Sequence, residues 1–386
     1  CVIDCERSGR GFWFHNGETA AATVRGFTIR NGYDFARGGG ICCQDSSSPT
    51  LINCIITDNL CAGWGAGLAC WYDSSPAVIN CRISNNRAFA GHGGGVCCHD
   101  SCNPNLINCT ITGNTGEAPA SMSWGAGGMC VHNSCNPTLT NCTITGNNAE
   151  AVWGCACYGS AATLTNCILW GNTSEEIHVE SGSPVVSYCD SQGCWTGVGN
   201  IAAEPLFACG GDFHLLPDSP CIDGGTNAPP GGLPADDLDG QSRVVDGDGN
   251  GTAVADMGAY EFNPTMPIVA VTPTELSFFL PPNQTSSESL QIRNTSLGAM
   301  AWAVTCDAGW LSADPPAGES AGEIDEIMLT ADAAGLTHGI YTTTVELNAP
   351  EALNPSRIIP VILYVTSTLH VPGEHPTIQA AIDAAI

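Results

Sequence analysis

The sequence predicts an all-β chain, in which a right-handed parallel β-helix solenoid is followed by an Ig-like β-sandwich and a short terminal strand and helix. A repeat within residues 1–262 predicts the solenoid, and strand-like alternation within residues 263–366 predicts the sandwich. The composition agrees with an all-β fold, because 46 of the 386 residues are Gly, 24 are Pro and only 12% are charged.

The repeat is clearest in residues 38–59, 65–86, 93–114 and 126–147, and a shorter copy occupies residues 154–172. Each longer copy runs from small residues through Cys and Pro to an Asn-Cys pair. This pair recurs at residues 53, 80, 108, 141 and 166. Short alternating runs divided by Gly, Pro and Asn are typical of strands and turns, and no copy has a helical stretch. One copy therefore matches one coil of a parallel β-helix, whose coils stack about 4.8 Å apart.

Stacking turns each repeat position into a column of like residues. We expect one buried column to contain Ile41, Leu68, Val96 and Met129. We expect the Asn of each Asn-Cys pair to form an amide ladder at a turn. Phe27 replaces the Cys of the pair in an early degenerate copy, so we expect this column to hold reduced, buried thiols. Disulfides or metal ligands remain the alternative, because a chain with 23 Cys is typical of an oxidising compartment.

Two further Cys pairs align on neighbouring coils. Cys102 and Cys135 stand where other coils have Ser, and the coil separation permits a disulfide between them. We predict this disulfide. Cys97 and Cys130 also align, and His99 and His132 follow each of them by two residues.

These two Cys and two His residues form a candidate tetrahedral metal site. A Cys97–Cys130 disulfide and free surface groups remain alternatives for the same residues.

A second candidate metal site lies in the acidic segment 237–262. Asp246, Asp248 and Asn250, followed by Gly251, match the first half of a calcium-binding loop. Asp256 stands at loop position 11, whereas such a loop carries its bidentate acid at position 12. Calcium is therefore the one cofactor that the sequence predicts. A series of turns rich in Asp and Asn, capping the solenoid, is the alternative.

The charge pattern limits the partners of the protein. The net charge is −28 and there is no Lys, so nucleic acid and other polyanions would be repelled. No apolar run is long enough to cross a membrane, so no membrane insertion is expected. The residues that precede the glycine runs on successive coils could stack as a surface column: Arg37, Trp64, His92, Trp124 and Trp153. We expect them to pack within loops, and a platform for a glycan is the alternative.

Catalytic patterns are weak. No nucleophile elbow, zinc-protease or phosphate-loop motif is present. Asp45, Asp73 and Asp100 approach a stacked set of carboxylates but fall out of register. We therefore expect no enzyme, with a polysaccharide lyase or hydrolase as the alternative.

The repeats, followed by "EPLFACGGDFHLLPDSPCIDGG" and "DGDGNGTAVADMGAYEF", resemble right-handed β-helix repeat proteins of the pectate-lyase-like superfamily, of the polymorphic-outer-membrane-protein type. The resemblance covers residues 1–262, with residues 200–262 as a closing segment. It implies a secreted or surface-exposed protein, since many such proteins have that location and no demonstrated catalysis. Among the N-glycosylation sequons, those at Asn172, Asn250, Asn283 and Asn294 could then be modified.

Residues 263–366 are similar to BACON-like and other Ig-like bacterial domains, on the stretch "GWLSADPPAGESAGEIDEIMLTADAAGLTHGIYTTTVEL". Such domains are often proposed to bind carbohydrate or to act as spacers. Trp302 and Trp310 are therefore candidates for a sugar platform, but we expect both to be core residues.

Residues 367–386 resemble the start of such a β-helix, where a strand and a short helix cover the first coil. The apolar face of this helix would hold Ile378, Ala381, Ile382, Ala385 and Ile386. The solenoid itself begins without such a start. We therefore predict a structural extracellular or cell-surface protein, in which residues 367–386 cap the open coil of the next subunit, head to tail, or of the next module. The alternative is a carbohydrate-binding adhesin, or a polysaccharide-active surface protein, whose partners would be surface glycans.

Overall fold

The computed structural model describes the chain except residues 118–124, 150–154, 174, 209–210, 297 and 367–386. Every regular element of the described residues is a strand, so the predicted all-β fold is confirmed. The chain forms two units, one of Cys1–Phe207 with Phe213–Asn263, the other of Ala208–Asp212 with the residues from Pro264 onward. Residues 367–386, with the predicted contact residues Ile378 to Ile386, lie outside the described part.

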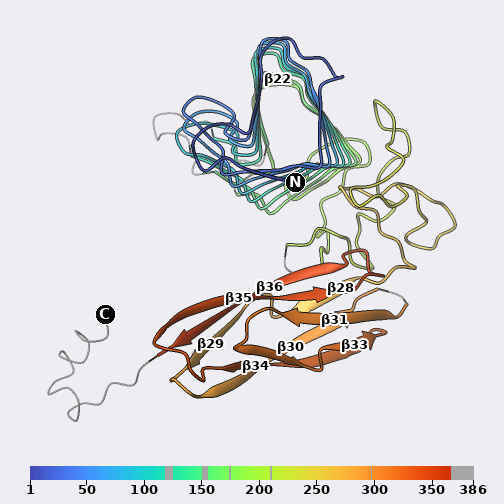
Figure 1. The fold of residues 1–386 in the computed structure, drawn as a ribbon. Helices are drawn as coiled ribbons and strands as arrows, with labels where there is room; N and C mark the ends of the chain where they lie inside the picture. Colours follow the sequence, from blue (N-terminus) through green and yellow to red (C-terminus); the bar gives the residue numbers. More distant parts are fainter. Residues whose placement is uncertain (118–124, 150–154, 174, 209–210, 297, 367–386) are drawn as a thin grey trace. The chain divides into compact units, whose positions relative to one another are not determined.

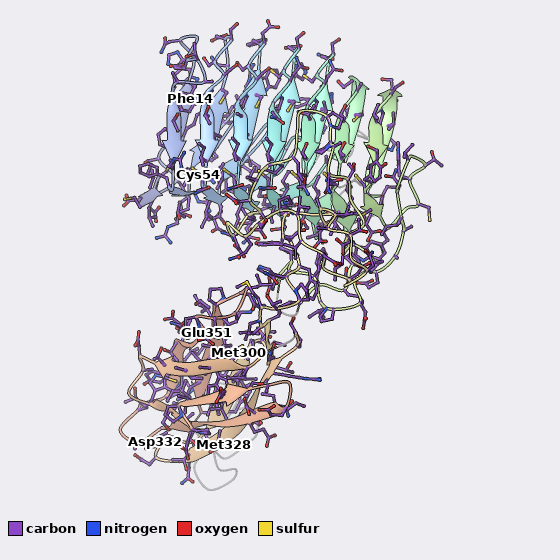
Figure 2. The ribbon with its side chains drawn as sticks, turned by 90° about the vertical axis from the view of Figure 1, so that its right-hand side faces the viewer. Phe14, Cys54, Met300, Met328, Asp332 and Glu351 are labelled. Atoms are coloured by element: carbon purple, nitrogen blue, oxygen red, sulfur yellow. The ribbon has the colours of Figure 1, made fainter. Side chains whose placement is uncertain are left out.

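The first unit is a parallel solenoid whose coils lie almost on top of one another when viewed along the stack (Figure 1). Sheet A contains β1 (Val2–Asp4), β4 (Thr28–Arg30), β8 (Ile55–Thr57), β12 (Arg82–Ser84), β16 (Thr110–Thr112), β20 (Thr143–Thr145), β24 (Ile168–Trp170) and β27 (Asp190–Ser191). Sheet B contains β2 (Phe12–Phe14), β6 (Ile41–Cys43), β10 (Leu68–Trp71), β14 (Val96–His99), β18 (Met129–His132), β22 (Cys155–Ser160) and β25 (Ile177–Gly182). Figure 2 shows the strands of sheet B side by side in chain order, with Phe14 on the first.

Two more sheets complete the coils. Sheet C contains β3 (Thr23–Arg25), β7 (Thr50–Ile52), β11 (Ala77–Ile79), β15 (Asn105–Ile107), β19 (Thr138–Thr140), β23 (Thr163–Thr165) and β26 (Val185–Ser187). Sheet D contains β5 (Tyr33–Asp34), β9 (Leu60–Cys61), β13 (Arg87–Ala88), β17 (Thr115–Gly116) and β21 (Asn148–Ala149).

The predicted apolar column is confirmed. Ile41 pairs with Leu68, Leu68 with Val96 and Val96 with Met129, and all four side chains are fully buried. The Cys column is also buried from Cys54 to Cys189, and its thiols are free. A thiol fills these positions as a small apolar side chain would, so the predicted core placement is confirmed, and the reduced state stays a prediction.

The predicted amide ladder is confirmed in two of its steps: the side-chain amide of Asn108 donates to Asn80 at 3.1 Å and that of Asn166 to Asn141 at 3.4 Å. The continuous ladder uses the second Asn of each coil, and these five buried residues are Asn59, Asn86, Asn114, Asn147 and Asn172. Each side-chain amide donates to the side-chain oxygen of the next Asn at 2.9 or 3.0 Å. The Asn residues of the Asn-Cys pairs instead take left-handed backbone angles, with φ of 52° at Asn53 and 50° at Asn108. Asn tolerates this conformation, so its role there is to turn the chain.

These turning Asn residues hold the segment that follows the coils. Asn166 donates to the carbonyl of Thr226 at 2.9 Å, Asn141 to Asp256 at 3.0 Å and Asn108 to Asp236 at 2.7 Å. The segment therefore runs back along the flank of the solenoid, over the corner of three successive coils. The described part of residues 213–263 contains no strand, only bridges and turns.

The second unit is a β-sandwich. One sheet contains β28 (Val269–Thr272), β30 (Thr285–Asn294), β34 (Ile324–Asp332) and β32 (Leu311–Asp314). The other contains β29 (Leu276–Leu280), β36 (Ser356–Val365), β35 (Gly339–Asn348), β31 (Met300–Cys306) and β33 (Ala317–Ser320). Trp302 is buried and its indole N–H donates to Asp325 at 2.7 Å, while Trp310 packs against the core. Trp302 is thus a core residue, as predicted, and Trp310 is partly buried against the same core.

Candidate functional site

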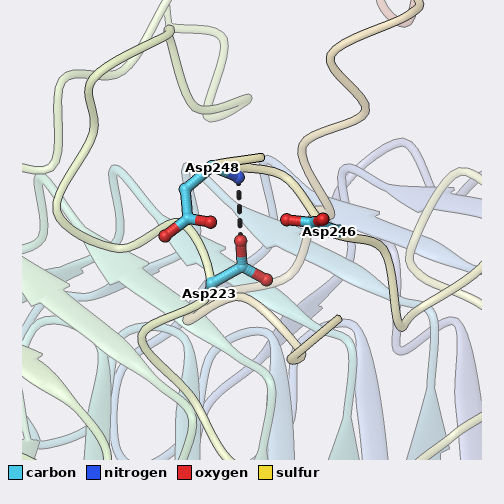
Figure 3. A group of neighbouring side chains, drawn as sticks. All are labelled: Asp223, Asp246 and Asp248. Carbon is cyan, nitrogen blue, oxygen red and sulfur yellow. Dashed lines mark hydrogen bonds between the residues drawn. The ribbon is translucent and has the colours of Figure 1, made fainter. Parts of the chain in front are cut away.

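An acid cluster on the flank segment is the candidate metal centre. Carboxylate oxygens of Asp223, Asp246 and Asp248 all lie within 4.8 Å of one another (Figure 3). Within the described ranges, no other group of three or more His, Cys, Asp or Glu residues gathers as closely. Oxygen ligands of this kind suit a hard cation such as calcium.

Backbone amides fix the three carboxylates. Asp223 accepts from the N–H groups of Gly247 at 2.9 Å and Asp248 at 2.8 Å, and Asp246 accepts from Gly251 at 2.9 Å. The other oxygen of Asp246 is buried and has no hydrogen-bond partner. Burial raises the pKa of Asp223, since a desolvated carboxylate is less stable than its protonated form. A cation at the cluster would supply the missing partner and offset this cost.

The sequence predicted two of these three acids. Asp246 and Asp248 are in the cluster, whereas Asn250 turns back and its side chain donates to Asp248 at 2.7 Å. Asp256 is not in the cluster. It is fully buried, and its two oxygens accept from the N–H groups of Asp223 at 2.7 Å and Phe262 at 2.6 Å. Asp223, in "SPCIDGG", was missed, because it belongs to a different part of the segment.

A buried arginine lies beneath the cluster. Arg243 donates to the carbonyl of Ala259 at 2.7 Å and to the side chain of Asn108 at 2.8 Å, and lies 3.5 Å from Glu261. Arg243, Asp256 and Glu261 are all almost fully buried. Burial raises the pKa of both acids, while the guanidinium acts in the opposite direction. This network joins the flank segment to the turning Asn of the solenoid.

The predicted Cys-His metal site is not assembled. Cys97 and Cys130 pair on neighbouring strands and face out from sheet B, as predicted, but both are fully buried. The sulfur of Cys130 lies 3.0 Å from Nε2 of His132, and the side-chain amide of Asn133 lies 3.3 Å from Nε2 of His99. The four side chains pack among aromatic rings and do not converge on one point.

Aromatic rings form a row along the outside of sheet B. Trp71 stacks on His99 at 4.1 Å between ring centroids, and His132 stacks on Tyr158 at 4.3 Å. Arg37 lies over Trp71 at 3.9 Å. Trp64 packs against this row, and its ring centroid lies 4.4 Å from that of His92. Trp64 and His92 belong to the predicted column of residues that precede glycines. The row of Trp71, His99, His132 and Tyr158 was not predicted. Trp71 is buried, and burial lowers the pKa of His132 to about 3.

Cys102 and Cys135 lie on neighbouring coils, as expected, and both are buried free thiols in the structure. They belong to a line of hydroxyl and thiol groups in which the backbone N–H of Ser74 donates to Cys102 at 3.3 Å and that of Cys102 donates to Cys135 at 3.1 Å. The disulfide between them stays a prediction for an oxidising environment.

The sequons at Asn172, Asn250, Asn283 and Asn294 differ in accessibility. Asn250 and Asn283 are exposed, whereas Asn172 and Asn294 are buried. The amide of Asn172 donates to the carbonyl of Ile144 at 2.9 Å, and that of Asn294 donates to Gly298 at 2.7 Å. Of these four, only Asn250 and Asn283 offer a free face for a glycan in the folded chain.

Comparison with known protein families assigns the solenoid to a family. The family described as "right handed beta helix region" matches residues 1–125 and 119–199, which is more than half of the chain. The chain belongs to the right-handed β-helix family. That fold occurs in enzymes and in non-enzymes, so it assigns no reaction. The family described as "viral BACON domain" matches residues 269–355, which agrees with the predicted BACON-like sandwich. No curated protein matches the chain.

Two solved structures that resemble part of the chain each match about a quarter of it. A PapD-like domain of human CEP192 has 12% identity and a TM-score of 0.25, and the match covers 28% of this chain and 92% of that domain. A GH5 xyloglucanase of Bacteroides ovatus, solved with a heptasaccharide, has 19% identity and a TM-score of 0.21, over 27% of this chain and 20% of the enzyme. Similarity at this level carries no functional argument. In the part of the chain that the structure describes, no helix has the length and apolar character needed to cross a membrane.

Proposed function

We propose that this right-handed β-helix protein is a structural module of an extracellular or cell-surface fibre, in which another copy or the next module covers the first coil. The observation that carries the proposal is the state of that coil. β1, β2 and β3 are each the outermost strand of their sheet, and no described strand pairs with their outer edges. Such edges accept additional strands, and natural proteins normally cover them.

The end of the solenoid core that is formed by the first coil is apolar. Phe12, Phe14 and Phe27 pack against the core but are only partly buried, and Trp13 is 50% exposed. Another chain that covers this end would remove apolar area from water, which favours association. A contact between two different surfaces of identical copies builds an open filament if it does not close into a ring.

The sequence offers residues 367–386 as the covering segment, through the apolar face that contains Ile378 and Ile382. Removal of residues 367–386 should abolish filaments seen by negative-stain electron microscopy. Ile382→Asp should have the same effect, while Ala380→Asp, on the opposite side of the predicted helix, should leave filaments intact. Filaments that persist without residues 367–386 would contradict this choice of segment.

Calcium at the acid cluster is part of the same proposal. Asp223, Asp246 and Asp248 would hold the ion, which would tie two separate parts of the flank segment to each other. The buried oxygen of Asp246 that has no partner supports this assignment.

Glycan binding is the second candidate function. Tyr72 and Phe89 are 42% and 39% exposed, and Arg37 lies 3.4 Å from the hydroxyl of Tyr72. Exposed aromatic rings beside a hydrogen-bond donor suit a sugar ring. A glycan array in which binding by the intact chain is lost in Tyr72→Ala would support an adhesin, and an array without any signal would contradict it.

A further inference from the structure

The last coil of the solenoid is incomplete on one side. The chain continues past sheets C and A, where the N–H of Tyr188 donates to the carbonyl of Val198 at 2.8 Å and Asp190 forms a parallel bridge with Ile201. Sheet B does not continue, because β25 is its last strand and no described strand pairs with its outer edge. The chain beside β25 instead runs through exposed residues 192–194, and Trp195 is partly buried against the core. One strand position beside β25 is therefore skipped.

A pocket of about 800 Å³ lies at the skipped position. Ile177, His178 and Val179 of β25 line one side, and Gln192, Gly193 and Trp195 line another. Ile177 and Val179 face inward in the core column of the sheet, so they offer apolar surface to a neighbouring strand. The pocket thus combines a free strand edge with an apolar floor, which is the arrangement that accepts an added strand.

The pocket is acidic. Glu175 and Glu176 line it, and the chain has no Lys or Arg between Arg87 and Arg243. Glu176 is 5% exposed and ends the amide ladder, since it accepts from both the backbone N–H and the side-chain amide of Asn172. Glu175 is exposed at the mouth. An occupant that carries a positive charge would complement Glu175, whose carboxylate also lies 3.3 Å from Nδ1 of His178.

The pairing register of sheet B indicates where the positive charge of an added strand would lie. Phe12, Ile41, Leu68, Val96, Met129, Cys155 and Ile177 form one line of paired positions. Arg10 stands two residues before Phe12, and Glu175 stands two residues before Ile177. A parallel strand that pairs beside Ile177 and carries a basic residue just before the paired stretch would bring its charge to the side of the pocket lined by Glu175.

We propose that the pocket binds an extended, basic peptide segment of a partner protein as a parallel strand beside β25, with apolar side chains over Ile177 and Val179 and a Lys or Arg at Glu175. The whole first coil of a second copy does not fit there, because residues 196–201 occupy the next position in sheets C and A. A single extended strand meets no such obstacle. The inference is independent of what covers the first coil.

The test uses the full chain and two blocked peptides, Ser-Arg-Gly-Val-Thr-Val-Ser and the same peptide with Glu in place of Arg. Calorimetry should detect binding of the Arg peptide and at least tenfold weaker binding of the Glu peptide. Hydrogen exchange should show protection of residues 177–182 by the Arg peptide alone. Equal binding of the two peptides, no binding at millimolar concentration, or protection elsewhere would overturn the proposal.

Three variants locate the site. Glu175→Gln should weaken the Arg peptide about fivefold, since a charge-assisted hydrogen bond is lost. Gly193→Phe should abolish binding, because a side chain there meets no other atom within 4 Å and would project into the pocket. Glu204→Gln, another exposed acid, should bind as the unaltered chain does. Unchanged binding in Gly193→Phe would place the peptide elsewhere.

Discussion

The backbone N–H of Asp223 donates to the carboxylate of Asp256 at 2.7 Å, so one hydrogen bond connects the candidate calcium cluster to the buried arginine network. Asp223 lies in the cluster, and Asp256 faces Arg243 and Glu261 beneath it. The state of the cluster and the stability of the flank segment are therefore coupled.

Calcium should stabilise the first unit. A ligand that binds only the folded state raises the melting temperature, and at a hundredfold excess over its dissociation constant it adds about 2.7 kcal/mol. Differential scanning calorimetry should show this increase in the intact chain and its loss in Asp248→Asn. Asp236→Asn, an exposed acid of the same segment, should respond to calcium as the intact chain does. No response of the intact chain would argue against a calcium site.

Raised pH should destabilise the first unit. Burial raises the folded-state pKa of Asp256 and Glu261, so the folded state binds protons more tightly than the unfolded chain does. Their contribution to stability is present below the ordinary carboxyl range of about 4 to 5 and is lost as the pH rises through the raised values. The melting temperature, measured without calcium, should be higher at pH 5 than at pH 9.

Glu261→Gln separates this effect from the repulsion of surface acids. The variant removes a buried titrating group and keeps an acceptor for the N–H of Val245, which donates to Glu261 at 3.1 Å. Its melting temperature should change less between pH 5 and pH 9. If the melting temperature of the variant changed with pH as much as that of the intact chain, the pH dependence would come from the surface acids.

The amide ladder should be essential for the stability of the coils. Asn114 makes three bonds of 2.9 to 3.0 Å through its N–H and its side-chain amide, and accepts from Asn86. Asn114→Ala removes the side-chain bonds and leaves buried partners unpaired, which should cost about 3 kcal/mol in urea unfolding. Asn105→Ala, at an exposed strand position, should cost less than about 1 kcal/mol. Equal costs would contradict the role of the ladder.

Most thiols should be protected from alkylation. Cys1 and Cys194 are exposed, whereas the thiols of the core columns are buried, and burial raises the pKa of Cys109 and Cys167. The reactive species is the thiolate, so iodoacetamide should label Cys1 and Cys194 first and the columns only after denaturation. Mass spectrometry of a proteolytic digest of the labelled protein would reveal a Cys102–Cys135 disulfide. Rapid labelling of the columns in the folded chain would contradict the reduced core.

The coils could be predicted from the sequence because strand spacing converts a repeat into columns. Ile41, Leu68 and Val96 needed only the period and the alternation to be placed in the core. The continuous ladder was missed because each coil has two Asn residues near a turn, and the predicted one forms only in part. Only the backbone shows that Asn53 turns the chain with a φ of 52°, while Asn59 points inward.

The candidate site was harder to predict because it joins separate parts of a segment without strands. Asp246 and Asp248 are adjacent in a known loop pattern, but Asp223 has no periodic signal to place it. The pocket beside β25 could not be foreseen either, since it arises where the chain skips a strand and inserts Trp195.

Negative-stain electron microscopy of the purified full chain tests the central claim most directly. The claim is that one copy or module covers the first coil of the next, so the account predicts filaments with an axial repeat at micromolar concentration. Phe12→Asp, which places a charge at the core end of that coil, should convert them to single particles. Monodisperse particles from the unaltered chain at every concentration would contradict a fibre subunit.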